Sequence, residues 1–80
     1  MDTKDLVVRR LRELCFEHDI ALNSLANLSG ITPSTVYSIT DRSRKDVGIV
    51  TLKKLCDGLG ISLFDFFDTD YFRDMEQELV

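Results

Sequence analysis

Residues 20–40, IALNSLANLSGITPSTVYSIT, constrain the fold of this chain more than any other stretch. They predict a short helix over residues 22–29, a tight turn at Gly30 and a second short helix over residues 33–40. Gly30 supplies the left-handed backbone conformation that ends many helices. Thr32 is a suitable N-cap, and Pro33 at the first helical position costs no hydrogen bond. The stretch therefore predicts two short helices joined by a sharp turn.

Apolar residues at spacings of three and four predict further helices on both sides of this pair. One helix is expected over residues 3–18 and another over residues 50–58. Ser62, with Asp65 three residues later, predicts the start of a fifth helix, and Thr69 or Asp70 the start of a sixth. The predicted fold class is all-α: a compact five-helix domain with a short sixth C-terminal helix.

Eighty residues are enough for one modest core, so we expect a single domain over residues 1–80. Within it, residues 22–40 form the pair of helices described above and residues 65–80 an acidic, aromatic extension. The sixth helix in this extension would carry an apolar stripe formed by Tyr71, Phe72, Met75 and Leu79.

The charge of the chain is unevenly distributed. The net charge is −4, but residues 1–64 hold nine basic and eight acidic residues, a balance of +1, and residues 65–80 hold one basic and six acidic residues, a balance of −5. The densest basic cluster, Arg42, Arg44 and Lys45, directly follows the second helix of the pair. No stretch is apolar enough for a membrane span, and the N-terminus does not resemble a signal peptide, so we expect a cytoplasmic location.

Few residues suit catalysis or metal binding. Cys15 and Cys56 occupy apolar helix positions and are expected to be buried, reduced thiols. His18 lies near the end of a helix, where its interaction with the helix C-terminus explains it best. Three soft ligands fall short of the four that a zinc site usually needs. The sequence predicts no metal, no cofactor and no enzymatic activity.

The pair of helices over residues 22–40 has the helix-turn-helix arrangement, in which the second helix enters the major groove of DNA. The chain also resembles the phage-repressor-like, XRE-type helix-turn-helix family of bacterial and phage transcription regulators. The resemblance covers residues 5–67. It rests on the pattern L-A-x-x-S-G-I-T-x-S-T-V from Leu25 and on L-G-I-S-L from Leu59. It implies a five-helix DNA-binding domain that binds double-stranded DNA, with the second helix of the pair as the recognition helix.

The chain departs from this family at three positions. Leu22 stands where the family commonly has a glutamine that contacts a DNA phosphate. Cys15 and Thr40 stand where the family often has an arginine–glutamate ion pair. Because both partners are replaced together, no unpaired charge is left, and such a replacement need not reduce stability.

The recognition helix offers hydroxyls and a ring but no Arg, Lys, Gln or Asn, the residues that make strong bidentate base contacts. We therefore expect modest direct readout, with affinity from phosphate contacts and specificity partly from DNA shape. Lys53 and Lys54 are candidates for additional phosphate contacts. The predicted DNA-contacting residues are Asn23, Thr32, Pro33, Ser34, Thr35, Tyr37, Ser38, Arg42, Arg44 and Lys45.

The aromatic residues between 64 and 72 exceed what a core of this size is expected to need. Some of these aromatic side chains are therefore expected to form a homodimer contact. A dimer would match two DNA half-sites about one helical turn apart. The predicted contact residues are Phe66, Tyr71, Phe72 and Met75. The alternative to DNA binding is a protein-interaction module, such as an antitoxin or an anti-regulator, which the net acidity and the polar recognition helix would suit.

Overall fold

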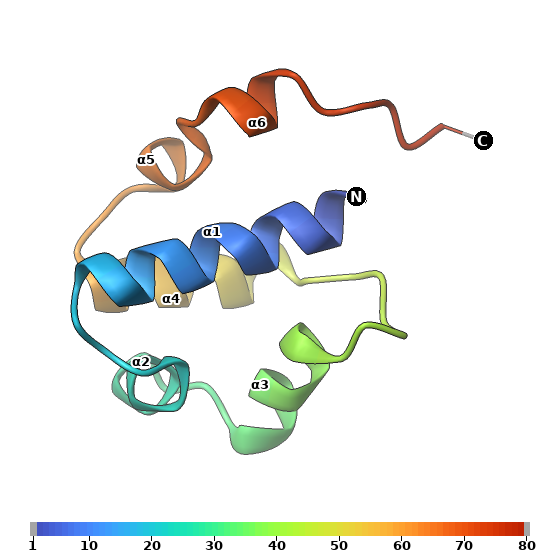
Figure 1. Cartoon of the computed structure of the whole chain (residues 1–80). Helices are drawn as coiled ribbons and strands as arrows, with labels where there is room; N and C mark the ends of the chain where they lie inside the picture. The colour runs from blue at the N-terminus through green and yellow to red at the C-terminus, as the bar shows by residue number, and fades with distance from the viewer. Residues whose placement is uncertain (1, 80) are drawn as a thin grey trace.

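A computed structural model describes residues 2–79, and these residues form six helices and no strand. The helices are α1 (Thr3–Glu17), α2 (Leu22–Leu28), α3 (Pro33–Thr40), α4 (Ile49–Leu59), α5 (Leu63–Phe67) and α6 (Asp70–Arg73). In Figure 1, α1 runs across the front of α4, with α2 and α3 on one side of this pair and α5 and α6 on the other. The predicted all-α fold with a short sixth helix is confirmed.

Local sequence explains where most helices begin. Asp2 caps α1, and its side chain and that of Asp5 form a reciprocal capping box. Ser62 and Asp65 form the same motif at α5, as predicted. Thr32 caps α3 and Pro33 occupies its first turn. The first residue of α2 follows Ala21, which makes no side-chain cap, so α2 depends on packing for its stability.

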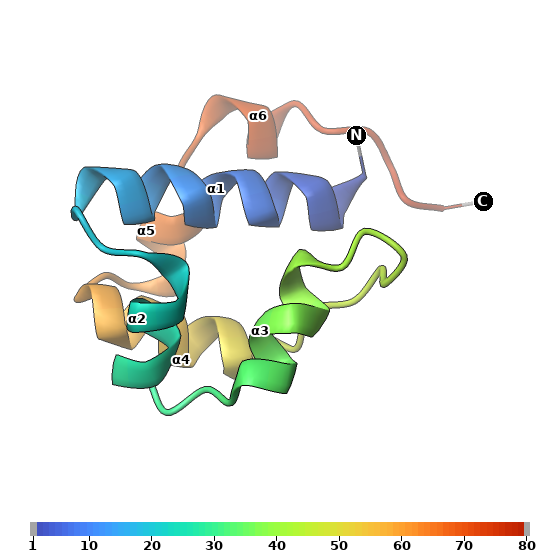
Figure 2. The same ribbon diagram turned by 60° about the horizontal axis from the view of Figure 1, so that its bottom comes forward.

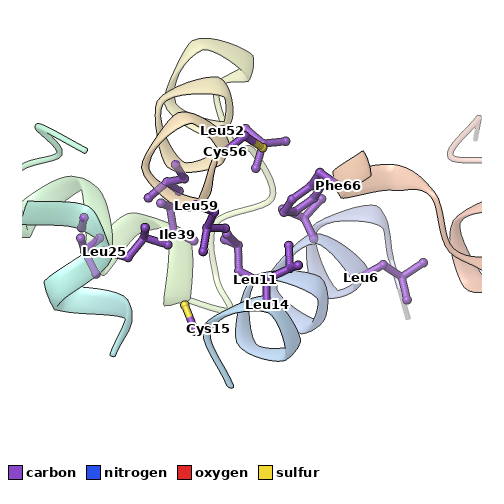
Figure 3. Close-up of a cluster of buried hydrophobic side chains, with 14 of the residues drawn as sticks. Leu6, Leu11, Leu14, Cys15, Leu25, Ile39, Leu52, Cys56, Leu59 and Phe66 are labelled. Carbon is purple, nitrogen blue, oxygen red and sulfur yellow. The ribbon is translucent and has the colours of Figure 1, made fainter. Parts of the chain in front are cut away.

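One apolar core holds the six helices together. Leu11 and Leu14 from α1 belong to the same buried cluster as Leu55 from α4, and Figure 3 shows Phe66 entering this core from α5. Phe66 is the largest of the fully buried side chains and is 0 % exposed. Both cysteines are buried and unpaired, and burial raises the pKa of each thiol. The core residues are Leu6, Val7, Leu11, Leu14, Cys15, Leu25, Ala26, Val36, Ile39, Leu52, Leu55, Cys56, Leu59, Phe66 and Phe72.

Gly58 allows α2 and α4 to approach closely. A Cβ atom at this position would lie 2.2 Å from the Ser29 hydroxyl and 3.1 Å from a methyl group of Leu25. The Ser29 hydroxyl is buried and makes no hydrogen bond to a described residue. The close approach holds α2 at a fixed distance from the core and so positions the turn at Gly30, whose φ of 75° is left-handed as predicted.

The C-terminal extension differs from the prediction. The sixth helix ends at Arg73, and residues 74–79 are irregular, so the predicted apolar stripe stops before Met75. Leu79 is 86 % exposed and has no apolar surface to cover, which removes the driving force for a longer helix. The segment instead runs back toward the start of α1, where Glu78 accepts hydrogen bonds from the backbone N–H (2.7 Å) and hydroxyl (2.6 Å) of Thr3. These bonds lower the pKa of Glu78.

Two arginines of α1 connect this helix to α5 and α6. Arg10 donates to the carbonyl oxygens of Phe66 (2.7 Å) and Asp65 (3.0 Å) at the end of α5. The guanidinium of Arg9 lies over the ring of Tyr71, 4.2 Å from its centroid. Tyr71 donates its hydroxyl proton to Glu13, and burial together with this bond raises the pKa of Tyr71 to about 12.

Candidate nucleic-acid interface

The helix-turn-helix unit presents α3 at the edge of the molecule. Figure 2 shows α3 beside the end of α2, followed by the loop that leads to α4. Val36 and Ile39 point into the core and fix the rotation of α3. The opposite face is therefore open to solvent, and Tyr37 on this face is 67 % exposed. Ser34 is also exposed, whereas Thr35 and Ser38 are partly buried.

The hydroxyls of α3 bond mainly to one another and to the helix backbone. Thr32 Oγ1 lies 3.2 Å from Ser34 Oγ and 3.0 Å from Thr35 Oγ1. The Ser38 hydroxyl donates to the carbonyl oxygen of Ser34 at 3.1 Å. This surface is polar but its hydrogen-bonding groups are already partly used, which suits weak rather than strong discrimination between bases.

Asn23 and Pro33 are brought together at the turn. Both line a hollow between α2 and α3, and Ile31 lines it too. Asn23 is exposed near the N-terminus of α2, and Pro33 is exposed at the start of α3. The fold thus brings together two of the residues predicted to contact DNA.

The cationic segment, defined as Arg42, Arg44 and Lys45, lies in the loop after α3, and all three side chains are exposed. Arg44 pairs with Asp41 at 3.6 Å, and Lys45 pairs with Asp2 at 3.0 Å. Arg42 makes no ion pair with any residue from 2 to 79. The three charges are therefore not equivalent, and Arg42 is the one with no competing carboxylate partner.

Two carboxylates organise this loop. Asp41 accepts hydrogen bonds from the hydroxyl (2.8 Å) and the backbone N–H (3.0 Å) of Ser43, and these bonds lower its pKa. Asp2 accepts from the Asp5 backbone and from Lys45, which lowers the pKa of Asp2 and raises that of Lys45. The loop is thus folded against the first turn of α1.

Comparison with known families shows the family of this chain. Residues 10–70 match the model of the Cro/C1-type HTH DNA-binding domain. The chain belongs to the Cro/C1-type helix-turn-helix family. The predicted resemblance to phage-repressor-like proteins is thereby confirmed, and α3 is the second helix of its helix-turn-helix unit.

A solved structure agrees with this family. The chain is similar to a protein described as "Crystal structure of the prophage Lp1 protein 11", with 32 % sequence identity and a TM-score of 0.85 over 92 % of this chain and 97 % of that one. The search of curated proteins gave no match. The Cro/C1-type fold is therefore shared with a prophage protein over nearly the full length of both chains.

Several expectations concern features other than DNA. Phe66 and Phe72, predicted at a dimer contact, lie inside the core of the single chain at 0 % and 8 % exposure, and Tyr71 is half-buried. Met75 is exposed.

Over residues 2–79, no helix has the length and apolar character needed to cross a membrane. Within the same range, no three His, Cys, Asp or Glu side chains gather as a candidate metal site.

One important residue escaped the sequence reasoning. Lys4 is one of the nine basic residues among residues 1–64 and was not singled out, but its side chain is buried and bonds to the loop after α3. Its position in the first turn of α1, on the same helical face as Val7 and Leu11, was the available signal. A lysine on an apolar stripe is expected to have buried partners for its charge.

Proposed function

We propose that the chain is a DNA-binding transcription regulator that places α3 in the major groove and holds the backbone through the cationic segment. The observation that carries this proposal is the adjacency of two surfaces. The exposed polar face of α3 is followed directly by Arg42, Arg44 and Lys45, in a domain of a DNA-binding family. A chain with this activity would act at the nucleoid.

Specificity in this proposal comes from shape and apolar contact more than from bidentate hydrogen bonds. Tyr37 offers an exposed ring, and Thr35 a methyl group that can contact thymine. The hydroxyls at residues 32, 34, 35 and 38 bond to each other or to backbone. Discrimination then depends on groove width and deformability as well as on base edges.

Affinity in this proposal depends on phosphate contacts, with Arg42 contributing most. Arg44 and Lys45 must exchange the carboxylates of Asp41 and Asp2 for phosphate oxygens, which offsets part of the gain. Arg42 has no such exchange to make with a described residue. A homodimer remains our expectation, because paired half-sites multiply the modest contribution of one recognition helix.

The experiment is a titration of the full chain with a random-sequence duplex and with a duplex from selection, at several salt concentrations. For the wild-type dimer, a plot of the logarithm of the association constant against the logarithm of the salt concentration should have a slope of about −4 or steeper. The triple variant Arg42→Ala, Arg44→Ala, Lys45→Ala should lose most of this slope, since each lost phosphate contact removes about one unit. Arg73→Ala, which removes a charge in α6, is the control and should leave the slope unchanged.

Two outcomes would contradict this proposal. A triple variant with a wild-type circular dichroism spectrum and wild-type retention on DNA would exclude the cationic segment as the anchor. Wild-type protein that binds neither duplex at low or high salt would favour the alternative, an antitoxin-like or anti-regulator module that uses the same scaffold to bind a protein.

A further inference from the structure

Lys4 is a buried lysine whose partners all lie in and after α3. Its side chain is 6 % exposed, although it is only the second residue of α1. The ammonium Nζ donates to the carbonyl oxygens of Ser38 (3.2 Å), Asp41 (3.2 Å) and Arg44 (2.7 Å). An ammonium group has three donors, so every N–H of Lys4 can be matched to one of these acceptors.

Two of these carbonyls, those of Ser38 and Asp41, lie at the C-terminal end of α3, where a helix leaves its last carbonyls without intrahelical donors. The last turn of α3 contains no basic residue, and its C-cap Asp41 has extended backbone rather than the left-handed conformation that closes many helices. The carbonyls at the C-terminus of a helix carry partial negative charge, which a cation stabilises. Lys4 supplies that cation from α1 and so takes the part of a capping residue for α3.

The bonds of Lys4 also lie on both sides of Arg42. The acceptors at residues 41 and 44 lie on either side of Arg42, and the Arg44 N–H donates to the Asp41 carbonyl at 3.1 Å. Lys45, the next residue, is held by Asp2, which also belongs to the start of α1. The start of α1 therefore holds the backbone on both sides of Arg42 through the two part-buried bonds of Lys4, and it holds the side chain of Lys45 through an exposed ion pair.

We propose that Lys4 is a positioning residue for DNA binding: it fixes the end of α3 and the cationic segment in one arrangement before DNA arrives. This inference rests on the proposed DNA-binding function. A loop that is ordered in the free protein loses less conformational freedom on binding, so more of its contact energy remains as affinity. Lys4 itself stays buried and contacts no phosphate.

The test compares Lys4→Met, which keeps the apolar stem but removes the donors, with wild-type protein on the same duplex. Affinity should fall roughly tenfold at a temperature where both proteins are folded. The magnitude of the salt slope should fall by about one per protomer, because Arg42 no longer meets its phosphate reliably. Arg73→Met removes one positive charge far from the loop and should change neither quantity.

Two further variants separate positioning from charge and from stability alone. Lys4→Arg keeps the charge, but a planar guanidinium cannot direct donors at three converging carbonyls, so this variant should also lose affinity. The double variant Lys4→Met, Arg42→Ala should lose less affinity than the product of the two single losses, because Lys4 acts through the placement of Arg42. Full affinity in Lys4→Arg, or multiplicative losses in the double variant, would overturn the positioning role.

A measurement on wild-type protein covers the case in which the Lys4 variants do not fold. Backbone order parameters for Ser43 and Arg44 in the free protein should be near 0.85, typical of a rigid backbone. Values below about 0.6 would overturn the inference, since the loop after α3 would then be flexible before DNA binds. If wild-type protein binds no duplex, the proposed function is contradicted. If wild-type protein binds, and folded Lys4→Met has the same affinity and salt slope, only the role of Lys4 is contradicted.

Discussion

At the scale of single residues, Gly58 shows how a missing side chain determines the position of a helix. It lies inside α4, where an alanine would ordinarily be favoured by up to about 1 kcal/mol. Here the added Cβ would meet the Ser29 hydroxyl at 2.2 Å. The steric cost should therefore outweigh the helix propensity.

We expect Gly58→Ala to lower the free energy of unfolding by about 1–2 kcal/mol, since overpacking a tight contact typically costs 1–3 kcal/mol. Urea denaturation followed by circular dichroism gives the value. Ser29→Ala removes the opposing hydroxyl, which has no described hydrogen-bond partner, and should recover at least half of the loss in the double variant. A stabilising effect of Gly58→Ala alone would show that α2 and α4 are less closely packed than described.

Single residues also mark the limit of what the sequence could predict. The caps at Thr32 and Ser62 and the turn at Gly30 were predictable, because each depends on neighbours within a few positions. The partners of Lys4 and Arg10 were not, since these side chains bond to backbone 34–56 residues away. A charged residue in a sequence indicates exposure by default, and only the tertiary fold provides the carbonyls that make its burial favourable.

At the scale of helices, Arg10 connects α1 to the end of α5. Its two hydrogen bonds run from a charged donor to carbonyls of Phe66 and Asp65, and bonds of this kind contribute about 1.5–3 kcal/mol when buried. Because Arg10 is partly exposed, the contribution is reduced by solvent. The bonds hold the short helix α5, and with it Phe66, against the core.

We expect Arg10→Met to lower the free energy of unfolding by about 1–2 kcal/mol, the two bonds being only partly shielded from water. Arg12→Met is the matched control: Arg12 is exposed, makes no ion pair within residues 2–79, and should change stability by less than about 0.5 kcal/mol. Equal effects of the two substitutions in thermal and urea denaturation would mean that Arg10 contributes only its charge.

The helices themselves differ in how well the sequence predicted them. The bounds of α3 agree with the prediction, because a cap and a proline define its start and two inward residues define its face. The sixth helix is shorter than its apolar stripe implied, because Met75 and Leu79 find no core to cover. Periodicity alone indicates where a helix can form, whereas its length depends on the surface available for packing.

At the scale of the whole molecule, the acidic C-terminal segment lies near the proposed DNA surface. Glu78 contacts Thr3, beside Asp2 and Lys45, and both views place this end of the chain on the same side as the loop after α3 (Figures 1 and 2). Negative charge within about 10 Å of bound phosphate is repelled by it at moderate salt. The segment should therefore weaken DNA binding.

We expect Glu76→Gln with Glu78→Gln to raise DNA affinity roughly twofold to fivefold at ~0.1 M salt, with the gain shrinking as salt is added. The matched variant Glu17→Gln with Asp19→Asn makes the same change in net charge at the far end of α1. It should have a smaller effect in the same fluorescence anisotropy titration. Equal gains from both variants would indicate net charge alone, with no contribution from the placement of the segment.

The contact between Thr3 and Glu78 has a practical consequence for engineering the molecule. Residues near the two ends of the chain touch, so a short flexible linker should suffice to join them into a circular permutant. New ends opened between α5 and α6 would leave the helix-turn-helix unit and its loop uninterrupted. A reporter protein inserted at that site would sit away from α3, which makes this small domain a convenient scaffold for monitoring occupancy of a duplex.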